Sequence, residues 1–397
     1  MSITRKFQLV FFLVSLQLTA FSQSHPTIDS SQRDLMEVLA KLFNGKATTS
    51  EEKKLNFSFV PAAGYAMHTG WAGMLTGNVG FYNGGNANGL QKISSVLMDV
   101  TYTENMQIMV PLYANIWTKG NKYNILIDHR FIKYPSKVFG LDDQRDIADG
   151  YFVDYNGMKL HQTVLRNLSP NFYLGLGYYF DALWNVRELD PPAGFKTAFQ
   201  DYGIQNKNTA AGPVFQLLYD SRLNTINPLN GMYASVAYRN NLKWMGSDTH
   251  WQSLQLDLRK YIRFPANSSN TLALWNLNWF TLNGRPPFLM LPSNGWDDSY
   301  NSGRGYIQGR FRGRNMMYYE TEYRFNITRN GILGGTVFLN GQTYSLKMFK
   351  DFVGFKTGYG FGLRIKLNKY SGSNICIDYG FGKNGSRGFA VNLGEIF

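Results

Sequence analysis

The chain has 397 residues, of which 44% are hydrophobic, 16% aromatic and only 17% charged, and its formal net charge is +13. In soluble domains about a quarter of the residues are charged, so this share is low for a soluble protein. The single cysteine excludes a disulfide framework or a cysteine-rich metal site. Beyond the N-terminus no apolar run reaches about 18 residues, which excludes a helical membrane protein. The basic residues are spread along the chain without a nucleic-acid-binding motif, so they favour a basic lumen or anionic lipids as partners, and no nucleic acid.

Residues 1–22 have the pattern of a cleaved secretory signal peptide. Two basic residues precede an apolar stretch that ends at Phe21, and Ala20 and Ser22 supply the small residues of a cleavage site. The stretch is short for a membrane anchor and contains two glutamines, so we expect cleavage before Gln23. The pattern predicts a protein of the periplasm, the outside or the outer membrane of a Gram-negative bacterium.

Residues 23–56 predict one short amphipathic helix followed by a polar linker, too small to form a domain. The helix is indicated by apolar residues at three- and four-residue steps, which place them on one face: Leu35, Val38, Leu39 and Leu42. We expect this periplasmic segment to cover the mouth of the following domain, or to contact another envelope protein.

Residues 57–397 alternate in polarity and divide into about sixteen runs bounded by Gly, Asn, Pro and Asp. A tilted transmembrane strand needs about 9 to 11 residues, and bacterial barrels have an even strand number. In the run 317–325, Glu320, Glu322 and Arg324 share one face and aromatic residues share the other. Such alternation suits a soluble β-sandwich as well as a barrel, but the signal peptide and the aromatic content favour an all-β, transmembrane antiparallel β-barrel.

Seven tryptophans scattered along the strands and their ends fit the aromatic girdles of such a barrel: Trp71, Trp117, Trp184, Trp244, Trp275, Trp279 and Trp296. The predicted last strand, 388–397, places four apolar residues on one face: Phe389, Val391, Leu393 and Phe397. Ending on an aromatic residue resembles the C-terminal sorting signal of outer-membrane barrels.

The longest connection between strands runs from about Leu282 to Arg314. Its core, residues 302–315, interleaves four arginines with glycine: Arg304, Arg310, Arg312 and Arg314. A basic surface loop that touches lipopolysaccharide would have this composition. The order of the motifs, however, resembles the Omp85 superfamily (BamA/TamA, bacterial surface antigen D15). Arg304-Gly305-Tyr306 is similar to the motif of its inward-folded sixth loop, and Glu322 is similar to the inward glutamate on the strand that follows.

Two other stretches carry the same resemblance. Asp220-Ser221-Arg222 through Asn227-Pro228 to Gly231 resembles a hairpin of the superfamily, and Asp378-Tyr379-Gly380-Phe381-Gly382 with Gly394-Glu395-Ile396-Phe397 resembles its last two strands. The resemblance covers residues 57–397. It implies a fold of one barrel and a function in protein insertion or translocation, or as an accessory of outer-membrane assembly, with assembly subunits or client proteins as partners.

The resemblance also implies a latch inside the barrel. A buried arginine must be paired, and a guanidinium can hold a carboxylate with two hydrogen bonds, so we expect Arg304 to bind Glu322, assisted by Glu320 or Asn340. Gly305 allows the tight backbone turn, and Tyr306 packs against the wall. Asn340 stands where the superfamily has an aspartate, which predicts a weaker latch or one more dependent on Glu322.

One departure is that only residues 23–56 precede the predicted barrel, which leaves no room for a POTRA domain and resembles superfamily members without one. Two alternatives therefore stay open: a passive porin-like channel, and a structural or lipid-organising barrel. The five histidines form no metal or hydrolase motif, and His161 and the pair Asp128-His129 are better explained as polar lumen or loop residues. We expect no enzyme activity, no metal and no cofactor.

Overall fold

The structure is a computed structural model that describes residues 32–35, 37–38, 55–83, 91–141, 150–191, 196–203, 205–296, 301–369 and 372–397. The predicted signal peptide lies outside the described residues, as does most of the predicted N-terminal helix.

Within this part of the chain the main elements are 17 β-strands. They are β1 (Leu55–Ala66), β2 (Gly70–Phe81), β3 (Ser94–Thr103), β4 (Ile108–Trp117), β5 (Tyr123–Lys133), β6 (Ser136–Val138), β7 (Tyr151–Ser169), β8 (Phe172–Leu189), β9 (Asn208–Asp220), β10 (Gly231–Asn241), β11 (Trp251–Arg263), β12 (Thr271–Gly284), β13 (Asn315–Asn326), β14 (Leu333–Ser345), β15 (Lys356–Lys366), β16 (Asn374–Phe381) and β17 (Arg387–Leu393). Short helices occur in the connections: α3 (Ala198–Tyr202), and the 3-10 helices η2 (Lys119–Asn121), η4 (Lys243–Met245) and η5 (Phe288–Met290).

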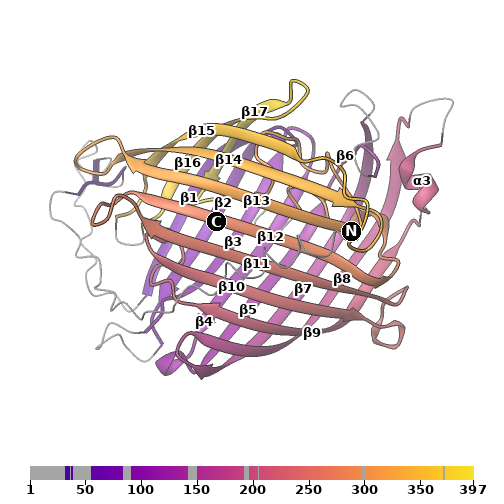
Figure 1. Ribbon diagram of the computed structural model, residues 1–397, viewed down its shortest axis with the longest axis horizontal. Helices are drawn as coiled ribbons and strands as arrows, with labels where there is room; N and C mark the ends of the chain where they lie inside the picture. The colour runs from indigo at the N-terminus through magenta and orange to yellow at the C-terminus, as the bar shows by residue number, and fades with distance from the viewer. Residues whose placement is uncertain are drawn as a thin grey trace, which may run out of the picture.

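The strands form one closed barrel (Figure 1). Consecutive strands pair antiparallel, and β17 returns to pair with β1. The short β6 continues β5 along the same neighbour, because Lys133 faces Asn156 and Ser136 faces Val153 on β7. Counting β5 and β6 as one wall strand gives sixteen, so the predicted barrel class and strand number are confirmed.

The polarity of the barrel is inverted relative to a soluble protein. On β14, Val337 and Leu339 are 48% and 59% exposed, whereas Phe338 and Asn340 between them are buried. The same alternation repeats on other strands, whose exposed outward residues include Leu174, Leu176, Phe215, Leu217, Tyr359 and Phe361. The charged Glu320, on β13, is by contrast buried inside. An apolar outer surface around a polar interior is the arrangement of a transmembrane barrel.

Only some of the tryptophans face outward, as aromatic girdles at the membrane interfaces require. Trp71 and Trp244 are 66% and 80% exposed, one at a strand end and one in the connection after β10. Trp117 and Trp275 are buried inside the barrel at 1% and 2%, and Trp279 and Trp296 pack against buried clusters there, so for these four the prediction was wrong. Inside the barrel Trp117 packs on Tyr173, Trp275 on Tyr318 and Trp296 on Tyr134.

The two ends of the barrel differ. At one end the connections are long, including 190–207 between β8 and β9 and 285–314 between β12 and β13, whereas at the other end β7 and β8 are joined by residues 170–171. The described part of the N-terminal segment lies against this turn-bearing end. The Arg33 N–H donates to the Asn330 carbonyl (3.0 Å), and the Lys369 N–H donates to the Asp34 carboxylate (3.0 Å).

Candidate functional site

The described parts of the connection between β12 and β13, residues 285–296 and 301–314, fold back against the inner wall and bring Arg304 into the barrel. The turn is built on Gly303 and Gly305, which have φ of +84° and +95°, a region that only glycine adopts without strain. A Cβ on Gly380 of β16 would lie 2.6 Å from the Gly305 nitrogen. Glycines on the wall therefore let the loop backbone approach it closely.

The Arg304 side chain is buried and surrounded by carboxylates. Its Nη2 donates to Glu320 and Glu322 of β13, and its Nη1 donates to Asp378 of β16 over 2.8 Å. The guanidinium also lies over the Phe338 ring, 3.6 Å from the ring centre. The loop is thus tied to two strands that lie on either side of β14 and β15.

Two more arginines extend the contacts into a network. Arg324 Nε lies 2.5 Å from Glu322 and 3.5 Å from Glu395. Arg364 of β15 lies 2.5 Å from Asp378 and 2.9 Å from Glu395. We call this group the charged network, and its members are Arg304, Arg324, Arg364, Glu320, Glu322, Asp378 and Glu395. Three positive and four negative groups nearly balance, as buried charges require.

The structure brings most of the predicted latch residues together. Glu320 and Glu322 bind the Arg304 guanidinium, as the sequence predicts. Asn340 has a different contact from the one expected: its side-chain N–H donates to the Arg304 carbonyl (2.9 Å), and among the described residues its Oδ1 accepts no hydrogen bond from the guanidinium. Tyr306 packs on the Phe311 ring and donates its hydroxyl to the Thr357 carbonyl (2.7 Å).

Three members of the charged network were missed by sequence reasoning: Arg364, Asp378 and Glu395. The resemblance to the superfamily places a further carboxylate at the position of Asn340. Asp378 supplies that carboxylate instead, from β16, two strands further round the wall. Its inward phase in the run Asp378-Tyr379-Gly380 was available as a signal. No signal in the sequence indicates that this run pairs with a loop more than seventy residues away.

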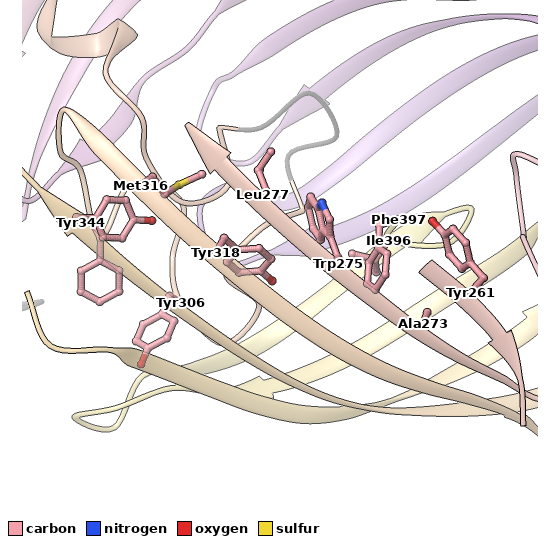
Figure 2. Packing of buried hydrophobic residues seen from close by; sticks show 11 residues of the cluster. Tyr261, Ala273, Trp275, Leu277, Tyr306, Met316, Tyr318, Tyr344, Ile396 and Phe397 are labelled. Atoms are coloured by element: carbon pink, nitrogen blue, oxygen red, sulfur yellow. The ribbon is translucent and has the colours of Figure 1, made fainter. Parts of the chain in front are cut away.

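The C-terminal segment also differs from its prediction. β17 ends at Leu393, and Gly394 has φ +91°, so the chain turns and the predicted strand 388–397 is too long. Phe389 and Leu393 are exposed on the outer face, whereas Phe397 is buried. The Phe397 ring stacks on Trp275 inside the barrel, with centres 5.1 Å apart (Figure 2). Phe397 therefore does not share a face with Phe389, Val391 and Leu393; the sorting role of these four residues stays a prediction.

This inward turn attaches the C-terminal segment to the charged network. Arg324 Nη2 donates to the Phe397 carbonyl oxygen (3.0 Å), and Glu395 is paired with Arg324 and Arg364. The Phe397 ring of this segment packs with Trp275 and Tyr318 in the hydrophobic cluster of Figure 2. The loop, the inner wall and the segment after β17 are thus held by one set of contacts.

The barrel is closed by a very short seam. β1 and β17 are in register at Ala66 and Ala390 alone among the described residues. On their other sides, β1 pairs with β2 along all 12 of its residues and β17 pairs with β16 along all 7 of its own. Among the described residues, the facing edges of the two strands therefore have no other registered pair.

The rest of the inward loop is anchored among aromatic residues. Arg312 is buried, its Nη1 donates to the carbonyls of Phe288 (3.0 Å) and Leu291 (3.4 Å), and its guanidinium lies over the Phe288 ring. Burial lowers the pKa of the Arg312 guanidinium to about 10. Arg312 is therefore a structural anchor of the loop, and not a surface residue for lipopolysaccharide.

The hairpin after β9 carries a second, smaller ion cluster. Arg222 Nε lies 3.0 Å from Asp220, and the Lys92 ammonium lies 3.6 Å from the same carboxylate. The Arg222 guanidinium also lies over the Tyr233 ring. These contacts fix the hairpin at the turn-bearing end of the barrel.

No metal site is formed by His, Cys, Asp or Glu in the described residues. His161 contacts the Asp181 carboxylate at 3.0 Å, and His129 contacts Gln162 at 3.0 Å. None of the helices in the described ranges is long and apolar enough to cross a membrane.

No family model and no curated protein matches this sequence. Among solved structures, BamA from Haemophilus ducreyi lacking POTRA domains 1-3 matches with a TM-score of 0.52 and 14% identity, over 87% of this chain and 70% of that one. CdiB from Acinetobacter baumannii matches with a TM-score of 0.56 and 14% identity, over 87% and 60%. CdiB from Escherichia coli matches with a TM-score of 0.57 and 10% identity, over 87% and 63%.

The chain therefore spans about three fifths of the length of the two CdiB chains. At these identities the likeness shows the fold. It confirms the resemblance to Omp85-type barrels at that level: the chain is a sixteen-strand transmembrane barrel with the fold of BamA and CdiB.

Proposed function

We propose that this protein is an outer-membrane barrel of the Omp85 type that acts in the insertion or translocation of proteins, or as an accessory of that process. The observation that carries the proposal is the seam between β1 and β17. In the described part of the chain it holds one registered pair, while both strands are fully paired on their other sides.

A strand edge with unpaired N–H and C=O groups is a template for another strand. In the hydrocarbon region such groups must find partners, because lipid supplies none. A client strand that pairs with β1 or β17 would satisfy them. The barrel would then assist insertion by offering a pairing edge at membrane depth, and the client would leave when its own strands close.

The charged network supports the same proposal by keeping the rest of the barrel rigid. It holds the loop at Arg304 against β13 and β16, and it holds Glu395 beside β15. The wall next to the seam is thus fixed from inside, so opening can be confined to β1 and β17. The two alternatives, a passive channel and a structural barrel, need no such seam.

We place the protein in the outer membrane, with outer-membrane lipids and lipopolysaccharide around its apolar outer face. Outer-membrane fractions should contain it, and its gel mobility should change on heating, because a folded barrel resists the detergent until heated. Recovery of the chain in the soluble periplasmic fraction would contradict this location. We expect no catalytic activity from it.

The function is tested by the folding of an eight-stranded client barrel into liposomes. Liposomes that contain the purified full-length chain should fold the urea-unfolded client faster than protein-free liposomes, as measured by the heat-modifiable band. Liposomes with an unrelated sixteen-strand porin at equal density are the control. Equal rates in all three, together with steady conductance of this chain in planar bilayers, would favour the passive channel instead.

A further inference from the structure

The hairpin between β9 and β10, residues 221–230, reaches across the turn-bearing mouth of the barrel. The side-chain N–H of Asn227 in this hairpin donates to the Gly372 carbonyl (3.1 Å) in the turn between β15 and β16. The nearest strands of the two connections, β10 and β15, are five strand spacings apart along the wall, which is roughly 24 Å at about 4.8 Å per spacing. Because the straight line between two points of a closed wall runs over its opening, the hairpin and the turn meet over the lumen.

Both partners of this contact have a fixed local shape. In the hairpin, Asn224 Oδ1 accepts hydrogen bonds from the N–H groups of Ile226 (2.8 Å) and Asn227 (3.0 Å), which closes a tight turn just before the contact. In the turn between β15 and β16, the Gly372 N–H donates to the Asn368 carbonyl (3.0 Å). Two preformed turns therefore meet, and little chain has to be ordered when they do.

The described part of the N-terminal segment is bound to the same turn through Asp34. This residue is 3% exposed, and its carboxylate accepts hydrogen bonds from the N–H groups of Lys369 (3.0 Å) and Glu37 (2.8 Å). Hydrogen bonds to a carboxylate are stronger than those between neutral groups. Since Lys369 lies inside the turn that the Asn368–Gly372 hydrogen bond closes, Asp34 fixes the turn that presents Gly372 to the hairpin.

We propose that the hairpin 221–230 and the described turn residues 367–369 and 372–373 form a mouth bridge that closes the turn-bearing end of the lumen, and that Asp34 holds this bridge in place. When the Asp34 contacts are lost, the turn is released, the contact between Asn227 and Gly372 weakens, and the lumen becomes accessible from this end. The N-terminal segment thus acts as an autoinhibitory element. The proposal concerns the mouth and not the seam, so it does not rest on the proposed function.

A first test asks whether the hairpin crosses the mouth. A Cβ on Gly372 would lie 3.5 Å from the Asn227 Cβ, and disulfides join Cβ atoms about 3.5 to 4.5 Å apart. Asn227→Cys with Gly372→Cys, in a Cys376→Ser background, should therefore cross-link on mild oxidation of the full-length chain in lipid nanodiscs. Asn227→Cys with Ser269→Cys is the control, because Ser269 is exposed in the turn between β11 and β12, which is nearer along the rim.

The first pair should cross-link faster than the control pair. Equal rates, or a faster reaction of the control pair, would show that the hairpin is not held across the mouth, and would overturn the proposal.

A second test measures access to the lumen beneath the mouth bridge. Ser235→Cys, also in the Cys376→Ser background, places a thiol near the hairpin on the inner face of β10, where Ser235 is buried and accepts a hydrogen bond from Gln216. Fluorescein maleimide should label this thiol slowly while the bridge is in place. Asp34→Ala removes two hydrogen bonds to a carboxylate and should raise the labelling rate about tenfold or more. Asp34→Asn keeps one acceptor oxygen and should give an intermediate rate.

Asp351→Ala is the matched control, because Asp351 is an exposed carboxylate in the connection between β14 and β15, at the opposite end of the barrel. It should leave the labelling rate unchanged. Heat-modifiable mobility shows that each variant is folded. The proposal is overturned if folded Asp34→Ala and Asp34→Asn both label at the rate of the Ser235→Cys parent, or if Asp351→Ala raises the rate as much as Asp34→Ala does.

Discussion

Replacing Arg304 with alanine should destabilise the folded barrel and release the inward loop. The change leaves Glu320, Glu322 and Asp378 buried without their shared cation. Removing one partner of a buried ion pair costs about 3 to 5 kcal/mol in the free energy of unfolding, and water in the lumen would reduce this value. The temperature at which the barrel unfolds on gels should fall, and protease should gain access to residues 285–314.

The companion variants separate the ion pairing from the mere loss of a side chain. Arg304→Lys should rescue only part of the stability, since an ammonium cannot reach three carboxylates in the geometry of the fork. Arg304→Ala combined with Glu322→Gln should cost less than the sum of the two single changes. Arg314→Ala is the matched control, because this arginine lies on the same loop and donates only to the Gly284 carbonyl among the described contacts.

Full additivity of Arg304→Ala and Glu322→Gln would show that the two residues do not act together. The same holds if Arg314→Ala destabilises the barrel as much as Arg304→Ala does. The charged network would then be an arrangement of charges without a latching role.

The inward face of β13 was predictable from the sequence, because side chains on a strand alternate with a period of two. Glu320 and Glu322 follow from that rule, and the loop motif at Arg304 supplied their partner. The Arg304–Asp378 pair was not predictable, because it depends on how far the barrel curves between β13 and β16. The alternation of polar and apolar residues also does not indicate where a strand ends. The predicted last strand therefore ran on through Gly394 to Phe397.

The tryptophans illustrate a further limit of the sequence. Trp71 and Trp275 both occur in strand-like runs, yet one faces outward and the other is buried under Phe397. Tryptophan suits a membrane interface and a packed lumen equally, since its ring is apolar and its N–H is polar. The face is decided by strand register, and a shift of one residue reverses it.

Locking the seam should have the second large effect. Ala66 and Ala390 are the registered pair of β1 and β17, and facing residues of antiparallel strands lie about 4.5 to 5.5 Å apart, within the range of a disulfide. Ala66→Cys with Ala390→Cys should therefore cross-link on oxidation. The background carries Cys376→Ser, which removes the one native thiol.

The cross-link should hold together strands that otherwise share one registered pair, so the oxidised barrel should resist heat better than the reduced one. Leu217→Cys with Val236→Cys is the matched control, since this facing pair joins β9 and β10, which are firmly paired already. Oxidation of the control should change the unfolding temperature much less. An equal shift for both pairs would mean that the seam is no weaker than the rest of the wall.

The most direct measurement of the central claim is the rate of client folding by the seam variant before and after reduction. We predict that liposomes with the oxidised Ala66→Cys and Ala390→Cys chain fold the client no faster than protein-free liposomes, and that reduction restores the rate. The Leu217→Cys and Val236→Cys chain should be active in both states. If the oxidised seam variant folds the client as fast as its reduced form, β1 and β17 do not receive client strands and the proposed function is wrong.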